Sequence, residues 1–173
     1  MGQTVSRKAN SCRASGAVGK NPVVYRIFRK MFNPETAKDM RVLDFGAGKK
    51  PIHTQVLVAE GYDVDAFDLP ENMTPEHNKS AMIELYDVVL LSNVLNVQDG
   101  EREIQEVLSQ VAEVLRSGAH VIANFPASPR YSHMLNDQLA DILREFFQVV
   151  IPQEGREAGR GAVVFYMTNA FRR

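Results

Sequence analysis

The stretch "RVLDFGAGKKP", Arg41 to Pro51, runs from a short apolar segment into a turn that contains two glycines. An apolar run of this length that ends in glycine is typical of a buried strand and the ligand-binding turn after it. Gly46 and Gly48 carry no Cβ, so the backbone can turn tightly and a flat ligand can lie against it. Pro51 stands where a dinucleotide-binding turn has its third glycine. The stretch therefore predicts a nucleotide site but leaves its ligand open.

The rest of the chain alternates short apolar runs with amphipathic segments, which predicts an α/β fold. The runs 147–152 and 162–168 are joined by only a polar loop, so they predict an antiparallel hairpin at one edge of the sheet. The other strands alternate with helices, which predicts a Rossmann-like, mostly parallel sheet with helices on both faces. The expected strands are 41–45, 62–68, 86–92, 119–125, 147–152 and 162–168, and the expected helices are 22–32, 52–60, 101–116 and 132–146.

Two local expectations qualify this pattern. In the helix 52–60 we expect Ile52, Val56 and Leu57 to face inward. The gap from Asp68 to Tyr86 is short, with room for one small helix and a stub of strand, or for neither. The sheet is therefore expected to be abbreviated around its third strand.

The composition is that of an ordinary globular chain. Of 173 residues, 45% are hydrophobic and 24% charged, and no apolar run is long enough to cross a membrane. The single cysteine, Cys12, excludes an internal disulfide, and the four histidines lack ligand spacing. We therefore expect a cytoplasmic protein with no structural metal and no membrane contact.

Charge divides the chain unevenly. Residues 1–34 contain seven Lys or Arg and no acidic residue, whereas the whole chain has a net charge of −1. We expect residues 1–20 to form a flexible basic arm and residues 21–173 to form a single domain. Such an arm suits a nucleic acid or another anionic partner, and a solvated terminus is an equally good interpretation.

Two carboxylates decide the ligand of the turn. Asp68 ends the second strand, 20 residues after Gly48, which is the spacing of an acceptor for ribose hydroxyls. Asp44 would repel the phosphates of a dinucleotide, but it complements a ligand that carries an ammonium and a sulfonium. The turn therefore favours S-adenosylmethionine over NAD.

These motifs, in this order, resemble those of class I S-adenosylmethionine-dependent methyltransferases over about residues 20–170. "VLDFGAG" (42–48), "GYDVDAFD" (61–68) and "YDVVLLSNVLNV" (86–97) carry the resemblance, together with the helix, turn and strand that end at Pro126. A shorter match, "GKNPVVYR" (19–26), resembles enzymes of bacterial and phage DNA-modification loci. It implies that Lys20, Tyr25 and Arg26 fold over the cofactor as a lid.

The resemblance implies a set of cofactor-binding residues. The methionine end would lie by Asp44 and the glycines, the ribose and adenine edge by Asp68 and Leu69, and the methyl group by Ser92 and Asn93. The full set is Asp44, Phe45, Gly46, Ala47, Gly48, Asp68, Leu69, Ser92, Asn93 and Val94. The adenine contact in 69–85 is left open.

No catalytic residue is named from the sequence. His77 and His133 are candidate bases, although each is more simply a surface histidine. Arg130 and Tyr131 are candidate acceptor contacts. The expected activity is methyl transfer to a small molecule or a nucleic acid. The alternatives are a cofactor-binding module or partner subunit without activity and, less favoured, an NAD-dependent reductase.

Overall fold

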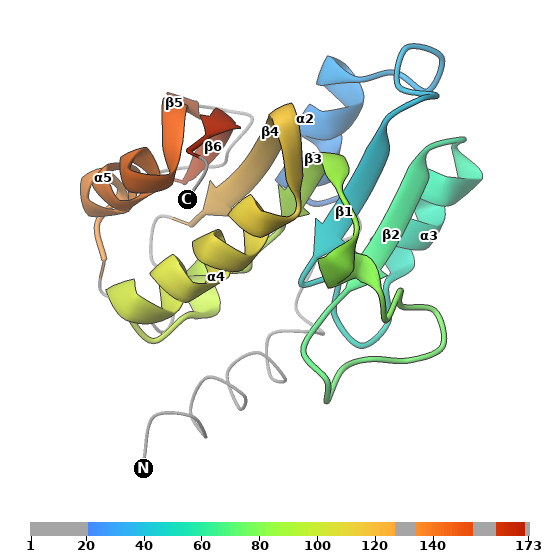
Figure 1. Ribbon diagram of the computed structural model, residues 1–173, viewed down its shortest axis with the longest axis horizontal. Coiled ribbons are helices and arrows are strands. Elements are labelled where there is room, and N and C mark those ends of the chain that lie inside the picture. Colours follow the sequence, from blue (N-terminus) through green and yellow to red (C-terminus); the bar gives the residue numbers. More distant parts are fainter. Residues whose placement is uncertain (1–20, 127–133, 154–161, 172–173) are drawn as a thin grey trace.

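A six-stranded sheet forms the centre of the protein, with its strands in the order β2-β1-β3-β4-β6-β5 (Figure 1). The computed structural model describes residues 21–126, 134–153 and 162–171. The strands are β1 (Arg41–Phe45), β2 (Asp63–Phe67), β3 (Tyr86–Leu91), β4 (Leu115–Phe125), β5 (Phe147–Gln153) and β6 (Val163–Ala170). The helices are α2 (Val23–Met31), α3 (Ile52–Ala59), α4 (Glu101–Glu113) and α5 (Asn136–Phe146), with 3-10 turns η1 (Ala81–Ile83) and η2 (Leu95–Val97).

The sheet has the mixed topology that the sequence predicts. Strands β2, β1, β3 and β4 are parallel neighbours. Strand β6 runs antiparallel to both β4 and β5, so the C-terminal hairpin inserts one strand into the sheet and leaves the other at its edge. The Rossmann-like sheet and the antiparallel hairpin are both confirmed.

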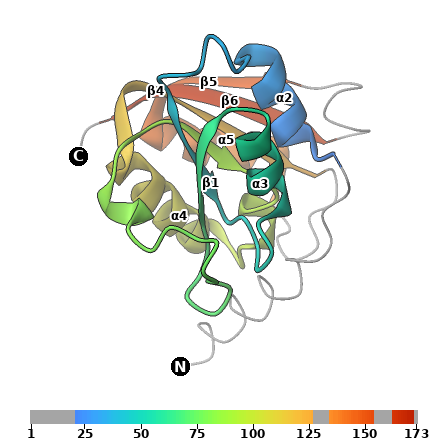
Figure 2. The ribbon, with the colours of Figure 1, turned by 90° about the vertical axis from the view of Figure 1, so that its right-hand side faces the viewer.

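Helices cover both faces of the sheet (Figure 2). In β3, Val88 and Leu90 face a core shared with α2 and α3, whereas Val89 and Leu91 face a core shared with α4 and α5. All four side chains are fully buried. A strand that is buried on both faces needs a continuous apolar run, which is why no polar alternation occurs in this segment.

Two predicted boundaries are wrong at the start of β4. The helix ends at Glu113 instead of residue 116, and the strand begins at Leu115 instead of residue 119. Leu115 already pairs with Tyr86, and the register shifts before the next pair. Gly118, with φ +75°, lies within this irregular part of the strand. The glycine therefore allows a bulge and does not cap the helix.

The inward face of α3 also differs from the prediction. Leu57 is buried as expected, but Ile52 and Val56 are 55% and 40% exposed. Thr54 faces inward instead, with 5% of its surface exposed. The helix is turned so that this hydroxyl reaches the end of β1, as described below.

The segment between β2 and β3 contains no strand, only η1, and all of its residues are described. Strand β2 is therefore the edge of the sheet on this side, which agrees with the abbreviated sheet that the short gap predicts. Of the two options left open there, the small helix forms as η1 and the stub of strand does not form. The amide of Asn78 donates to the carbonyl of Ala66 in β2 at 2.9 Å, so the loop partly covers this edge. None of the described helices is long and apolar enough to span a membrane.

Candidate functional site

The glycine turn, residues 46–51, lies where the carboxyl ends of β1, β2 and β3 meet. The amides of Gly46 and Ala47 both donate to the carbonyl of Phe67, at 2.8 and 3.1 Å. Gly46 has φ +79°, and a Cβ added there would lie 2.6 Å from Cγ2 of Val94. A side chain at this position would thus be both strained and obstructed. At the end of β1 the Phe45 ring packs against Phe67, with their centroids 5.4 Å apart.

Asp44, the fourth residue of β1, is a buried carboxylate that accepts two hydroxyl donors. The Tyr25 hydroxyl lies 3.0 and 3.1 Å from its two oxygens, and the Thr54 hydroxyl lies 2.6 Å from Oδ2. Only 1% of Asp44 is exposed. Among the described residues no cation forms an ion pair with it. Within the part of the chain that the structure describes, this carboxylate therefore lacks a compensating positive charge.

Burial raises the pKa of Asp44 from 3.8 to about 6, and the nearby Asp68 charge adds to the rise. The hydrogen bonds from Thr54 and Tyr25 act in the opposite direction because they favour the ionised carboxylate. Burial and the Asp44 charge raise the pKa of Tyr25 well above 10, so its hydroxyl stays protonated as a donor. The buried Ser92 hydroxyl has no hydrogen-bond partner among the described residues.

Asp68 follows β2 and ties the glycine turn to its own loop. Its Oδ2 accepts the Gly48 amide at 2.6 Å, and its Oδ1 accepts the Leu69 amide at 2.7 Å and the Asn72 side-chain amide at 2.8 Å. A carboxylate offers about four acceptor positions, so these contacts leave about one. The sequence predicts that the Asp68 carboxylate accepts two ribose hydroxyls. In the structure, three protein donors already occupy most of its acceptor positions.

His77 holds the other side of Gly48. Its Nδ1 accepts the Thr74 amide hydrogen at 3.0 Å, which places the ring proton of the neutral form on Nε2. Nε2 then donates to the Gly48 carbonyl at 3.0 Å. The interpretation of His77 as a surface histidine is wrong, since only 6% of it is exposed. With both nitrogens engaged, it serves to hold the turn.

A pair of asparagines joins the ends of β3 and β4. The amide of Asn93 donates to Oδ1 of Asn124, and Nδ2 of Asn124 donates to Oδ1 of Asn93, both at 2.7 Å. Asn93 has φ +58°, a left-handed conformation that asparagine tolerates. The motif "NFP" at 124–126 thus contributes a side chain that orients Asn93. The sequence offers no periodic signal for this contact or for those of Thr54, Asn72 and His77.

Of the three residues predicted to form a lid, the structure describes Tyr25 and Arg26. Tyr25 is buried against Asp44 and its ring stacks on His53, with centroids 4.8 Å apart. Arg26, the next residue, is exposed. Lys20 and the arm 1–20, as well as Arg130, Tyr131 and His133, lie outside the described residues.

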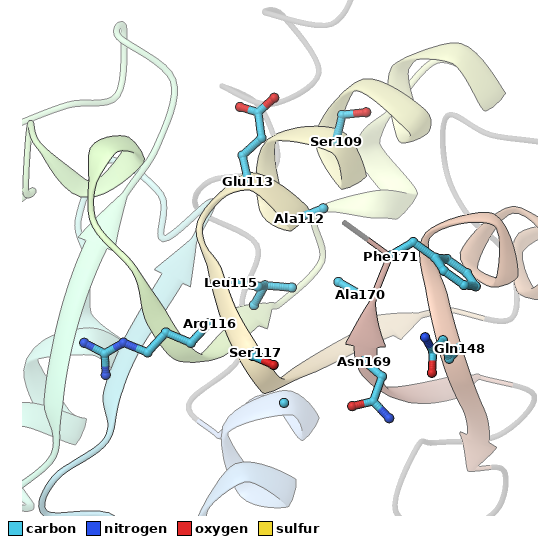
Figure 3. A pocket seen from close by; sticks show the side chains of 11 residues that line it. Ser109, Ala112, Glu113, Leu115, Arg116, Ser117, Gln148, Asn169, Ala170 and Phe171 are labelled. Carbon is cyan, nitrogen blue, oxygen red and sulfur yellow. The ribbon is translucent and has the colours of Figure 1, made fainter. Parts of the chain in front are cut away.

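Hollows in the described surface lie both next to the turn and away from it. One of about 370 Å³ adjoins it and is lined by Lys49, Lys50, Pro51, Ile52, Gln55, Thr74 and Glu76. Another has a volume of about 920 Å³. Ser117 of β4, Gln148 of β5 and Asn169 of β6 lie along its wall (Figure 3). The larger hollow contains none of the predicted site residues, so its size does not mark the site. In the described segments no cluster of three His, Cys, Asp or Glu side chains is placed to hold a metal.

Solved structures with this fold include several methyltransferases. A TehB-like enzyme from Corynebacterium glutamicum is 16% identical, with a TM-score of 0.62, over 96% of this chain and 99% of that chain. The 1,6-didemethyltoxoflavin-N1-methyltransferase of Burkholderia thailandensis is 19% identical, with a TM-score of 0.65, over 96% and 87% of the two chains. Its structure contains 1,6-didemethyltoxoflavin and S-adenosylhomocysteine. At these identities the likeness shows the fold.

The family follows from the sequence. A search of curated protein sequences gave no match. The family model described as "Methyltransferase domain" matches residues 22–154, which is well over half of the chain and includes the glycine turn, Asp68 and the end of β3. The chain therefore belongs to the methyltransferase domain family of S-adenosylmethionine-dependent enzymes, as the motifs of its first three strands imply.

Proposed function

We propose that this protein binds S-adenosylmethionine at the carboxyl ends of β1, β2 and β3 and methylates a small-molecule or nucleic-acid acceptor. One observation carries the assignment of the site. The Asp44 carboxylate is buried beside the glycine turn and has no cationic partner among the described residues. A buried charge without a counter-charge is costly unless a ligand supplies one.

The described residues fit this cofactor. Asp44 suits an ammonium group, and Gly46 allows the tight turn beside it, in which Val94 packs where a side chain would lie. Asp68 retains about one acceptor position for a ribose hydroxyl. A dinucleotide fits less well, because the negative charge of Asp44 opposes its phosphates.

When bound, S-adenosylmethionine supplies a methyl group already activated for displacement. The chain then has to align the acceptor and keep water away. Asn93 is held in a fixed orientation by Asn124, so it can position an acceptor. Tyr25 stays protonated and His77 is engaged on both nitrogens, so neither of these two groups is a free base.

A small-molecule acceptor is the better supported of the two classes. The Burkholderia thailandensis neighbour is named for a small acceptor, and another neighbour is the magnesium protoporphyrin IX methyltransferase of Synechocystis. The basic composition of residues 1–20 supports a nucleic acid instead. We also propose a cytoplasmic location, for which the single cysteine is the support.

Calorimetric titration with S-adenosylmethionine, S-adenosylhomocysteine and NADH tests the assignment. We expect the first two to bind at about micromolar Kd, and Asp44→Asn to weaken S-adenosylmethionine binding by about tenfold or more, since a charge-assisted contact is lost. Asp63→Asn is the control, because that carboxylate lies exposed at the opposite end of the parallel strands. Binding of NADH with no binding of S-adenosylmethionine would overturn the proposal.

A further inference from the structure

Tyr25 occupies a fixed position under the end of β1. Its neighbours on α2, Val24, Ile27 and Phe28, are at most 4% exposed and pack against the sheet. The Tyr25 ring itself is 3% exposed and stacks on His53 with an interplanar angle of 29°. Because the helix is anchored on both sides of Tyr25, the position of its hydroxyl is set by core packing and not by a mobile segment.

Two hydroxyls reach Asp44 from different helices. Tyr25 on α2 spans both carboxylate oxygens, and Thr54 on α3 meets Oδ2. Donors from two directions fix the plane of a carboxylate, and hydrogen bonds to its oxygens stabilise the charged form. The effect opposes burial and the neighbouring Asp68 charge, which both favour the protonated form. Among the described residues, the other charged or titratable groups near Tyr25 include His53, which stacks on its ring, and Arg29.

We propose that Tyr25 is a positioning residue of the cofactor site, which holds Asp44 ionised and in one orientation for the ammonium end of S-adenosylmethionine. The proposal rests on the proposed function, because it assumes that Asp44 receives this ammonium. Tyr25 acts through Asp44 and takes no part in methyl transfer. The helix α2 is then a structural part of the cofactor site. At Tyr25 this helix is held in place by core packing, so this residue does not act as a movable lid.

The test compares Tyr25→Phe with Tyr62→Phe. Both substitutions remove a hydroxyl from a buried tyrosine in the same apolar cluster. The Tyr62 hydroxyl, however, donates to the carbonyl of Phe32 at 2.6 Å and does not contact Asp44. Thermal unfolding establishes that each variant is folded, and Thr54→Val, which removes the second donor to Asp44, serves as an independent variant.

The first readout needs no ligand. Carbon-13 NMR of labelled aspartate side chains follows the ionisation of Asp44 directly. We expect the midpoint to rise by roughly 1 pH unit in Tyr25→Phe, since one hydrogen bond to a charged group is lost. The ionisation midpoint of Asp44 should also rise in Thr54→Val, and it should stay at the wild-type value in Tyr62→Phe. An unchanged midpoint in Tyr25→Phe would overturn the inference, whether or not the cofactor binds.

The second readout is the Kd of S-adenosylmethionine at two pH values. A midpoint that moves from about 6 to about 7 lowers the ionised fraction of Asp44 roughly fivefold at pH 6 and less than twofold at pH 8. Because ligand ionisation is the same for both proteins, the wild-type-to-variant ratio isolates Asp44. A purely structural defect would weaken binding equally at both pH values. Failure of the wild type to bind at all would instead refute the proposed function.

Discussion

Gly46 and Gly118 adopt the same left-handed backbone conformation, with φ of +79° and +75°, but their surroundings differ. A Cβ on Gly46 would meet Val94 at 2.6 Å, whereas nothing lies within 4 Å of one on Gly118. Glycine is thus required at residue 118 for conformation only, and at residue 46 for conformation and space.

This pair gives a matched prediction. We expect Gly118→Ala to lower the free energy of unfolding by about 1–2 kcal/mol, the cost of the left-handed conformation. Gly46→Ala should cost about 1–3 kcal/mol more, because the new methyl overlaps Val94. Urea unfolding of both variants measures the difference. Equal costs would mean that the turn relaxes freely away from β3 and is not a rigid cradle.

Single residues at the turn were predictable because their roles are local. Gly46, Gly48 and Asp44 lie within five residues of one another, and the strand-turn pattern places them at the end of β1. Thr54 was not predictable as a partner of Asp44. The apolar spacing in α3 favours Ile52 and Val56 on the buried face, whereas in the structure Thr54 faces inward and donates to Asp44.

At the scale of an element, the segment from Asp68 to Asn78 takes the place of a third strand and closes on the glycine turn. Asp68 binds the Gly48 amide and His77 binds the Gly48 carbonyl, so both backbone groups of this buried glycine are satisfied by the loop. Asn78 then pairs with Ala66 at the open edge of β2. The loop is therefore held by side chains and not by a strand ladder.

His77→Ala tests this role. The change leaves the buried Gly48 carbonyl without its donor, which costs about 1–3 kcal/mol. We expect hydrogen exchange to accelerate at the amides of Gly48, Leu69 and Asn78, while β3 and β4 keep their protection. The control is Glu76→Ala, since the neighbouring Glu76 is exposed and bonds only to Thr74 among the described contacts. Unchanged exchange in His77→Ala would show that the loop is held by its other contacts alone.

At the scale of the whole molecule, the fold buries the carboxyl group of Asp44. This burial lowers the stability of the protein at pH values where the group is ionised. Elements α2, α3 and β1 surround Asp44 and leave it 1% exposed. Its pKa is about 6 in the folded protein, against 3.8 for the ordinary side chain. The folded state thus binds this proton more tightly than the unfolded state does. Stability from this group is fully present below about pH 4 and is lost as pH rises through about 6.

The prediction compares wild type with Asp44→Asn in the absence of ligand. Asparagine keeps the shape but removes the charge, so the variant should lack this pH dependence. Between pH 4 and pH 7 the free energy of unfolding of wild type should fall relative to the variant by about 3 kcal/mol at most. Denaturant unfolding at several pH values measures it. A constant difference between the two proteins would mean that Asp44 titrates normally in the fold.

The sequence by itself determined the alternating α/β pattern, the C-terminal hairpin, the shortening of the sheet after β2 and the glycine turn. Each of these depends on periodicity or on neighbours within a few residues, which short-range patterns record. The tertiary structure alone decided that Tyr25 binds Asp44, that His77 holds Gly48 and that Asn93 pairs with Asn124. These partners lie 19, 29 and 31 residues apart. Their hydrogen bonds exist because helices and loops pack at particular angles on the sheet, and hydrophobic periodicity does not encode those angles.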